Sequence, residues 1–482
     1  MQHLTYKGEL EMIGRKAEQG ELMRMYESDE SEFVAIYGRR RVGKTYLVRE
    51  TFDGRFAFQH SGLATGGMKR QLANFALSLK TFGMSGRRVP KNWDEAFAFL
   101  REVIDGSRLA KKVVFIDEMP WMDTPRSNFI TALEGFWNGW ASARKDVLLI
   151  VCGSAAAWIS KKLFRNRGGL HNRVTCRICL NPFTIGECES LVREGGLSMS
   201  RMEIAECYMA LGGIPYYWRY LDKRFSMAQN FDRMFFCDGA PLADEFVELY
   251  SSLFRQSQMP RLIVRELAGR LSGMTRNDIA QSLNISASGK LTDALEALIA
   301  SGFVRQYNPF GSGRNNQVFQ LVDAFTLFHF RYLAGRRPSD GNFWLRTIDS
   351  PSHRTWCGLA FERLCLLHQR QIRKSLGIDG VLTECCAWLH RADKAHPDGA
   401  QIDLLFDRAD NVITVCECKY TSEPFRIDKE YDAKLARKVG VFREVTKTRK
   451  AIHLTMVSAS GLARNEYSSR FQSEVTLDDL FL

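Results

Sequence analysis

Residues 33–45 of this 482-residue chain read Phe33-Val34-Ala35-Ile36-Tyr37-Gly38-Arg39-Arg40-Arg41-Val42-Gly43-Lys44-Thr45. The first five residues are apolar and mostly β-branched or aromatic, which predicts a buried strand. The next eight have the spacing G-x-x-x-x-G-K-[ST], which is typical of a phosphate-holding loop between a strand and a helix. With the amphipathic residues 46–50 after it, the stretch predicts an α/β core with a doubly wound sheet.

The residue types of this loop fit the binding of ATP with Mg2+. Gly38 and Gly43 let several backbone N–H groups converge on one anion. We expect Lys44 to bridge the outer phosphates and Thr45 to place its hydroxyl on Mg2+. The predicted nucleotide-binding set is Gly38, Arg39, Arg40, Arg41, Val42, Gly43, Lys44, Thr45 and Tyr46. The alternative is an ordinary glycine turn.

Length and composition favour a soluble protein of two to four domains. Hydrophobic residues make up 45% of the chain without any long apolar run, and the first ten residues lack the apolar core of a secretion signal. We therefore expect a cytoplasmic location and no membrane partner. Of the twelve cysteines, Cys176 and Cys179 form C-x-x-C, but neither residues 385–386 nor residues 416–418 add a pair with zinc spacing. We interpret the thiols as reduced, small hydrophobes.

The net charge of +12, from 67 basic and 55 acidic residues, favours an anionic partner such as DNA. The excess is uneven along the chain. Residues 254–337 hold eleven basic and five acidic residues, a local surplus of six. This segment is the first candidate for contact with nucleic acid.

A second apolar run, residues 113–116, leads into Asp117 and Glu118. Hydrolysis needs a carboxylate near the metal and a group that activates water. We assign the metal role to Asp117 and the general-base role to Glu118. The alternative is a helix start, where acids favour the helix dipole.

Two further side chains are candidates for the same site. A third apolar strand, residues 147–152, ends before Ser154, which is expected to sense the γ-phosphate or position water. A helix N-cap is the competing role of Ser154. Arg173 is a candidate arginine finger from its own or a neighbouring subunit, in competition with Arg165, Arg167 and an ordinary solvated arginine.

Four motifs in the first half of the chain together resemble those of a known family. The run Ile13-Gly14-Arg15, the loop 37–45, Ile116-Asp117-Glu118 and Gly212-Gly213-Ile214-Pro215 resemble the archaeal-type ATPase family, an AAA+-related, STAND-like branch of P-loop ATPases. The resemblance covers the first half of the chain. It implies that Ile13 and Gly14 border the adenine and that residues 212–215 belong to a helical lid. Asn172 stands where the family would have glycine before the finger arginine.

The middle of the chain has the order of a winged helix-turn-helix. Helices are predicted over residues 261–267, 275–283 and 290–298, and strands over 302–307 and 317–321 flank a glycine-rich tip. We expect the third helix to enter a DNA groove and Arg314 to touch phosphate. Acids on that helix, and the use of such modules in protein contacts, leave a protein partner as the alternative.

A predicted hairpin near the C-terminus collects charge on one face. Its strands are residues 401–406 and 412–420, with a turn over residues 407–411. Pairing Phe406 with Val412 predicts that Asp403 faces Val415 and lies diagonal to Glu417. Because alternate residues share a face, Asp403, Glu417 and Lys419 gather there, which is a carboxylate set suited to Mg2+.

The spacing D-x13-E-x-K of Asp403, Glu417 and Lys419 resembles the PD-(D/E)xK nuclease superfamily. The resemblance implies that Asp403 and Glu417 hold the metal and that Lys419 helps to position or activate water. Residues 358–362 resemble the acidic helix before that core, which adds Glu362 as a metal-linked candidate. The alternative is an amphipathic hairpin with a charged exposed face.

These patterns predict four parts in sequence order. They are a P-loop ATPase core (1–180), a helical lid (181–253), a winged helix-turn-helix (254–337) and a restriction-endonuclease-like α/β domain (338–482). The predicted function is an ATPase whose nucleotide state controls a metal-dependent nuclease-like domain on DNA, with ATP, DNA, a protein at the winged helix and other copies of the chain as candidate partners. The alternative is a nucleotide-dependent switch or interaction scaffold whose C-terminal domain binds but does not cut.

Overall fold

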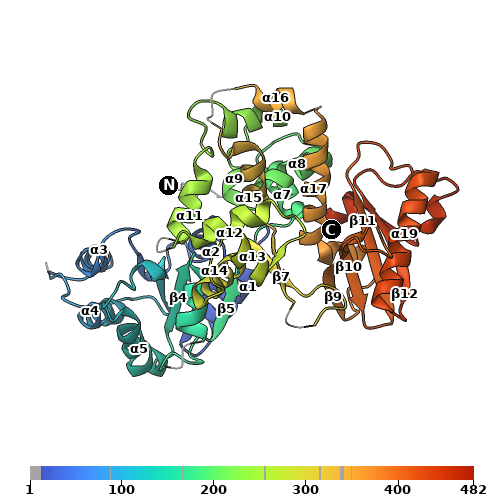
Figure 1. Cartoon of the computed structure of the whole chain (residues 1–482). Helices are drawn as coiled ribbons and strands as arrows, with labels where there is room; N and C mark the ends of the chain where they lie inside the picture. Colours follow the sequence, from blue (N-terminus) through green and yellow to red (C-terminus); the bar gives the residue numbers. More distant parts are fainter. Residues whose placement is uncertain are drawn as a thin grey trace. The chain divides into compact units, whose positions relative to one another are not determined.

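The computed structural model describes residues 12–86, 88–165, 168–254, 257–313, 316–336, 341–348 and 350–482 (Figure 1). The chain divides into two compact units, the first ending at Pro182 and the second beginning at Phe183. Within the described ranges, no helix has the length and apolar character needed to cross a bilayer. Each unit is described by itself.

The first unit is built on a five-stranded parallel sheet with the order β2-β3-β4-β1-β5. Its strands are β1 (Glu32–Tyr37), β2 (Phe56–Ser61), β3 (Lys112–Asp117), β4 (Val147–Gly153) and β5 (Cys176–Cys179). The predicted α/β class with a parallel sheet is confirmed. Because β1 pairs with β4 and β4 with β3, all in parallel, the loop after β1 and the acids Asp117 and Glu118 at the end of β3 lie at the same edge of the sheet.

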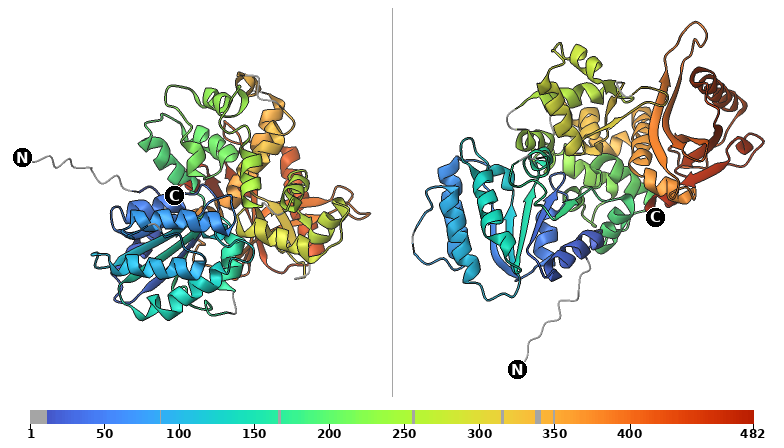
Figure 2. Two further views of the ribbon diagram at one scale, coloured as in Figure 1. Left: turned by 90° about the vertical axis from the view of Figure 1, so that its left-hand side faces the viewer. Right: turned by 90° about the horizontal axis from the view of Figure 1, so that it is seen from below.

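Helices lie on both faces of this sheet, as the view from below in Figure 2 shows. They are α1 (Lys16–Glu27), α2 (Lys44–Thr51), α3 (Met68–Thr81), α4 (Trp93–Asp105), α5 (Phe129–Gly139) and α6 (Ala156–Ile159), with the short turns η1 (Met119–Trp121), η2 (Ala141–Ala143) and η3 (Ser160–Phe164).

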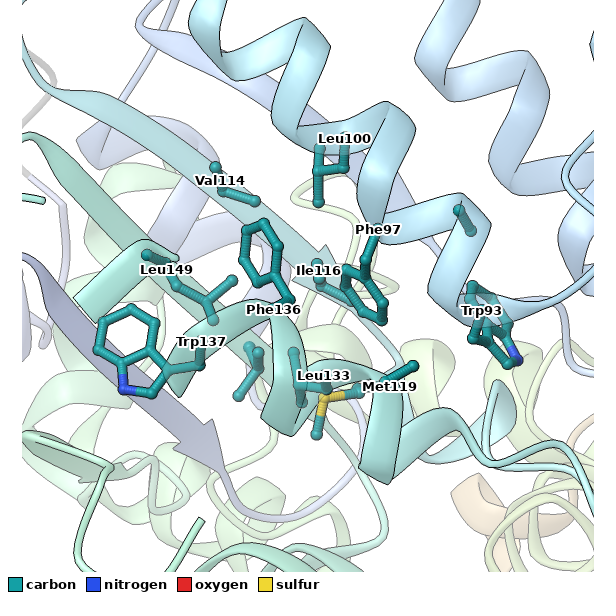
Figure 3. Packing of buried hydrophobic residues seen from close by; sticks show 14 of the residues in the cluster. Trp93, Phe97, Leu100, Val114, Ile116, Met119, Leu133, Phe136, Trp137 and Leu149 are labelled. Carbon is teal, nitrogen blue, oxygen red and sulfur yellow. The ribbon is translucent and has the colours of Figure 1, made fainter. Parts of the chain in front are cut away.

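The main core of this unit lies between α4, α5 and one face of β3 and β4 (Figure 3). Phe97 of α4 and Phe136 of α5 stack with ring centroids 5.2 Å apart. Val114 and Ile116 of β3 belong to the same cluster and are fully buried. Burying one such side chain contributes about 1.5–3 kcal/mol, so this layer fixes β3 and the acids that follow it.

The second unit begins with helices that two glycines help to pack. These are α7 (Ile185–Glu194), α8 (Arg201–Leu211), α9 (Pro215–Trp218), α10 (Met227–Phe231), the π-helical turn η4 (Asp232–Phe236) and α11 (Glu245–Leu253). Gly212 ends α8 with φ 62°, and a Cβ on Gly213 would lie 1.8 Å from the carbonyl oxygen of Phe183. The Phe183 N–H donates to the carbonyl oxygen of Gly213 across 2.7 Å, which holds the two backbones close together. Only glycine therefore fits at position 213.

Three helices and a small sheet follow. They are α12 (Met259–Ala268), β6 (Met274–Thr275), α13 (Arg276–Ser282), α14 (Gly289–Ala300), β7 (Val304–Tyr307) and β8 (Val318–Leu321), and the antiparallel sheet has the order β6-β8-β7. Thr275 begins α13 with a capping box that includes Asp278. Arg314, which we expected to touch phosphate, lies outside the described residues.

The last part of the chain forms a mixed sheet with the order β13-β12-β11-β10-β9. Its elements, with the helices before it, are α15 (Ala324–Phe328), η5 (His329–Leu333), α16 (Phe343–Thr347), α17 (Pro351–Leu367), α18 (Gln369–Ser375), β9 (Thr383–His390), β10 (Ala400–Arg408), β11 (Val412–Lys419), α19 (Lys429–Thr446), β12 (Ala451–Ser458), η6 (Ser468–Arg470), β13 (Ser473–Thr476) and η7 (Asp478–Phe481). Strands β9 to β11 are antiparallel, while β12 and β13 run parallel to β11.

The predicted register of the β10–β11 hairpin is wrong by two residues. Phe406 pairs with Thr414 and not with Val412. The cause is a shorter turn, since β10 continues to Arg408 and Asn411 takes a left-handed conformation with φ 64°. Val415 pairs with Leu405 and not with Asp403, and Asp403 and Glu417 are the next positions beyond the Leu404–Cys416 pair.

Candidate functional site

The loop after β1 is shaped by close backbone approach and by left-handed residues. Gly38 has φ 135°, and a Cβ there would meet the carbonyl oxygen of Leu180 at 2.3 Å. Arg41 and Gly43 have φ values of 71° and 94°. Arg40 and Val42 complete the loop. The conformation of the loop therefore depends on glycine at positions 38 and 43, the two glycines of the predicted pattern.

Lys44 lies at the first position of α2 and folds back over the loop. Its Nζ donates to the carbonyl oxygens of Gly38 (3.1 Å) and Arg39 (2.8 Å), and the side chain is only 6% exposed. Burial lowers the pKa of Lys44, and the carboxylates of Glu118 and Asp117 act in the opposite direction. A buried ammonium beside a loop of backbone amides fits the charge of a triphosphate.

Thr45 and Asp117 bring metal-binding oxygens together. The Thr45 hydroxyl donates to Oδ2 of Asp117 across 2.7 Å, although 72 residues separate them in sequence. The other Asp117 oxygen accepts from the Glu118 N–H at 2.9 Å. A hydroxyl and a carboxylate in contact, next to a phosphate-binding loop, are the donor set that Mg2+ takes in such sites.

Glu118 lies in a strained conformation at the end of β3. Its φ of 48° and ψ of 42° place a residue with a Cβ in the left-handed region, which costs roughly 1–2 kcal/mol. Burial raises the pKa of Glu118, whereas Lys44 and hydrogen bonds from Ser154 lower it. A carboxylate with these opposing influences is suited to accept a proton from water.

Ser154, at the end of β4, contacts Glu118 directly. Its hydroxyl donates to Oε2 of Glu118 at 3.1 Å and its N–H approaches the same oxygen at 3.4 Å. Helix α6 begins two residues later and Ser154 makes no cap to it. Ser154 therefore helps to hold the Glu118 side chain in place. The sequence pattern did not predict this contact.

The segment before α1 is anchored to the loop. Gly14 has φ 66°, and the next residue, Arg15, donates from Nη2 to the carbonyl oxygens of Val42 (3.1 Å) and Asn181 (2.8 Å). Ile13 precedes this anchor and is half-buried, while Tyr46 on α2 is 59% exposed. Sequence reasoning had used Arg15 only as part of a family motif.

Arg173 lies in the turn before β5, after Asn172 with φ 56°. Its side chain is exposed, and its N–H donates to the carbonyl oxygen of Leu170 across 3.1 Å. Among the described residues, no ion pair or hydrogen bond joins its guanidinium to Lys44 or Glu118. Its role as a finger stays a prediction, and its competitor Arg167 lies outside the described ranges.

A second charged cluster lies in the C-terminal sheet around Glu417. Its carboxylate accepts from Nζ of Lys438 at 2.8 Å and from the Tyr431 hydroxyl at 2.5 Å, and Nζ of Lys419 lies 3.1 Å away. Burial raises the pKa of Glu417, but the two lysines outweigh it and hold the pKa at about 2. Tyr431 and Lys438 are seven residues apart on one face of α19, and only packing of that face on β11 reveals their role.

Asp403 and Glu362 adjoin this cluster. Burial raises the pKa of Glu362 to about 7, and the nearby Asp403 and Glu417 carboxylates add to the effect while Arg363 and Lys419 oppose it. Within the described parts of the chain, Glu362, Asp403 and Glu417 are not among the groups whose donor atoms all lie within 4.8 Å of one another. The carboxylates are neighbours, but Glu417 is engaged by lysines.

Comparison with known proteins identifies the first part of the chain. Residues 12–221 match the family described as "ATPase domain predominantly from Archaea", so the chain carries an archaeal-type ATPase domain. An uncharacterized protein of Methanocaldococcus jannaschii, MJECL04, is 22% identical over 405 residues, covering 82% of this chain and 83% of that protein.

One solved structure supports the fold. The Walker-type ATPase PABY2304 of Pyrococcus abyssi is similar with a TM-score of 0.50 and 16% identity, covering 66% of this chain and 96% of the other. The ORC2 protein of Aeropyrum pernix is more distantly similar, with 14% identity and a TM-score of 0.41, covering 67% of this chain and 95% of the other.

Proposed function

We propose that the archaeal-type ATPase domain binds and hydrolyses ATP with Mg2+, and that its nucleotide state controls a nuclease-like C-terminal domain on DNA. The observation that carries the ATPase half is the meeting of Lys44, Thr45, Asp117 and Glu118 at one sheet edge. Lys44 would contact the phosphates, Thr45 and Asp117 would hold the metal with its water, and Glu118 would accept the proton of the attacking water. Mg2+ supplies charge neutralisation on the phosphates when bound.

Adenine would lie near Ile13 and Gly14, because Arg15 ties that segment to Val42 of the loop. Arg173, if it serves as the finger, would have to approach the γ-phosphate from its exposed turn. Ser154 keeps Glu118 oriented toward that phosphate. These residues would therefore serve three separate purposes. Ile13 and Gly14 would bind the adenine, Arg173 would stabilise the charge of the transition state, and Ser154 would support the activation of water by Glu118.

The ATPase half is tested by Lys44→Ala, with Lys80→Ala as a matched control. Lys80 is an exposed lysine near the end of α3. The first variant should lose nucleotide binding and phosphate release, since it removes the buried cation of the loop, while the control should match the wild type. Hydrolysis by Lys44→Ala at the wild-type rate would refute the site.

The nuclease-like half rests on the neighbourhood of Asp403, Glu417, Lys419 and Glu362. Asp403 and Glu417 adjoin the Leu404–Cys416 pair of the β10–β11 hairpin, and the charges of both carboxylates act on Glu362 of α17. The carboxylates would hold a divalent cation and Lys419 would orient the water. The test is nicking of plasmid DNA with Mg2+ or Mn2+, with and without ATP, by the wild type, Asp403→Ala and the control Asp410→Ala.

Asp410 is a suitable control because it lies in the turn of the same hairpin and forms an ion pair with the nearby Arg408. We expect nicking by the wild type and by Asp410→Ala and none by Asp403→Ala. Wild-type protein that never nicks under these conditions would end the nuclease proposal. Equal nicking by all three proteins would indicate a contaminant and remove the support as well.

We infer a winged helix-turn-helix within residues 254–337, because helices α12, α13 and α14 and the antiparallel strands β6, β7 and β8 follow that order. Two observations favour the alternative, a switch or scaffold that does not cut. The exposed face of α14 carries Lys290, Asp293 and Glu296, which is net acidic and unsuited to a DNA groove. Lysines also engage Glu417 directly.

The β7–β8 hairpin adds to this alternative, because its inner residues pack on the C-terminal sheet. Tyr307 and Phe310 border the core of that sheet, and the Phe310 N–H donates to the carbonyl oxygen of Ala387 across 3.0 Å. A hairpin docked this way can transmit movement between modules. DNA binding should be strongest at low ionic strength. If the protein binds no DNA even there, the scaffold is favoured over a protein that acts on DNA.

A further inference from the structure

Three residues of different chemistry, none of them part of the two sites above, meet inside the second unit. Glu206 lies on α8, and His353 and Cys357 lie on α17. One carboxylate oxygen, one imidazole nitrogen and the thiol sulfur all lie within 4.8 Å of one another. The sequence separates Glu206 from the other two by about 150 residues, so only packing of α8 on α17 brings them together.

His353 and Cys357 are four residues apart and therefore share one helical face. The Cys357 sulfur lies 3.3 Å from Nε2 of His353. In a tetrahedral zinc site, bond lengths near 2.3 Å to sulfur and 2.0–2.1 Å to nitrogen separate these two atoms by about 3.5 Å. The observed spacing is thus close to one edge of such a site.

Glu206 completes the set from the facing helix and is itself held in place. Its Oε1 accepts from the Tyr420 hydroxyl at 2.9 Å. A second residue that orients a ligating carboxylate is a regular feature of metal sites in proteins. His353 and Cys357 are 4% and 2% exposed, so bulk water reaches the cluster poorly.

We propose that Glu206, His353 and Cys357 form a zinc site that cross-links α8 to α17. Mixed nitrogen, sulfur and oxygen donors suit Zn2+ and not Mg2+, which takes oxygen ligands. Binding displaces the Cys357 thiol proton to solvent, and the thiolate and carboxylate together balance the two charges of the ion. A water molecule fills the fourth position.

The site lies beside functional segments of this unit. Tyr420 directly follows Lys419, and Glu362 lies on the same helix as Cys357. The cross-link would fix α17 against α8 and so hold Glu362 in place. The inference stands independently of ATP hydrolysis and of DNA cleavage, because it uses none of their residues.

The test uses the full chain, purified without chelators, with Co2+ as the probe. Cobalt bound to a thiolate gives a sulfur-to-metal charge-transfer absorption that carboxylate-only sites do not give. We expect this absorption at one equivalent of Co2+, its loss on adding one equivalent of Zn2+, and close to one zinc per chain by elemental analysis. No thiolate absorption from the wild type would overturn the proposal.

Variants assign the absorption to this cluster. Cys357→Ser keeps the size and the hydrogen bond to His353 but should abolish the absorption, while Cys365→Ala, a buried thiol two turns later on α17, should retain it. If Cys357→Ser does not fold, Glu206→Gln serves instead and should weaken cobalt binding at least tenfold while keeping the absorption. Unchanged cobalt binding in Glu206→Gln, or persistence of the absorption in Cys357→Ser, would show a purely hydrogen-bonded cluster.

Discussion

The hydroxyl of Ser154 donates to Oε2 of Glu118 across 3.1 Å, from the end of one strand of the parallel sheet to the end of its neighbour. Burial raises the pKa of Glu118, and this hydrogen bond is one of the influences that lower it. The pKa of Glu118 therefore depends on the position of Ser154 at the end of β4. A shift of either strand end would change the length of this hydrogen bond and, with it, the pKa of Glu118.

Ser154→Ala should lower the rate of ATP hydrolysis about tenfold and leave ATP binding within about twofold of the wild type. Without the hydroxyl the pKa of Glu118 rises further, so the acid side of the pH–rate profile should move to higher pH. Ser142→Ala, at an exposed serine of the same unit, is the control. An unmoved profile would separate Ser154 from the base.

Gly38→Ala should disrupt the phosphate-binding loop. The added Cβ would lie 2.3 Å from the carbonyl oxygen of Leu180, and φ 135° is unfavourable for any residue with a side chain. We expect at least a tenfold loss of nucleotide affinity and a lower melting temperature by differential scanning fluorimetry.

Gly135→Ala is the matched control for this change. Gly135 lies within α5, is exposed, and a Cβ there meets nothing within 4 Å. Alanine in such a helix position should stabilise by about 0.5–1 kcal/mol and leave nucleotide binding intact. Equal losses in both variants would mean that the close approach to Leu180 is not what requires glycine at position 38.

Acid should weaken the second unit through His368. The Ile185 N–H donates to its Nε2 at 2.9 Å and its Nδ1 donates to the Leu364 carbonyl at 2.9 Å, so the folded state holds a neutral ring. Burial lowers the pKa of His368 from 6.5 to about 4. Its contribution to stability is complete above pH 6.5 and is lost as pH falls from 6.5 toward 4, by up to about 3 kcal/mol.

Urea unfolding at pH 7.5, 6, 5 and 4 measures this loss. His368→Gln should be less stable than the wild type at pH 7.5 but should show a flatter dependence below pH 6.5. If the free energy of unfolding falls equally steeply with pH in both proteins, groups other than His368 cause the acid sensitivity.

Phe310 and Phe442 should be energetically coupled. Their ring centroids lie 5.2 Å apart, and Phe442 on α19 is buried in the core of the C-terminal sheet. A double-mutant cycle of Phe310→Ala and Phe442→Ala should give a coupling energy of about 0.5–1.5 kcal/mol in urea unfolding. Additive effects would argue that the β7–β8 hairpin does not hold the sheet.

Local pattern predicted the parts of this protein that depend on short stretches of chain. The apolar runs before Gly38 and Asp117 are strands, and the loop between β1 and α2 has the predicted glycines and lysine. The alternation along β11 places Glu417 and Lys419 together, where they form an ion pair, and separates them from Cys416 and Cys418, because side-chain direction in a strand has a period of two. These features need no information about distant residues.

Register and partners were not accessible in the same way. The turn at Asn411 sets whether Val415 pairs with Asp403 or with Leu405, and a turn of three residues cannot be told from one of five by strand pattern alone. Likewise, nothing in α19 marks Lys438 as the partner of Glu417 until the helix packs on the sheet.

The sequence by itself predicted the proposed nucleotide site, because the loop of residues 38–45 and the acids Asp117 and Glu118 can each be recognised from one short stretch of chain. Only the tertiary structure decided which side chains from different parts of the chain contact one another. Ser154 on Glu118, Arg15 on Val42, and Glu206 beside His353 are contacts between residues far apart in the chain. Spacing along a sequence fixes local geometry, whereas these contacts arise from the packing of one element on another.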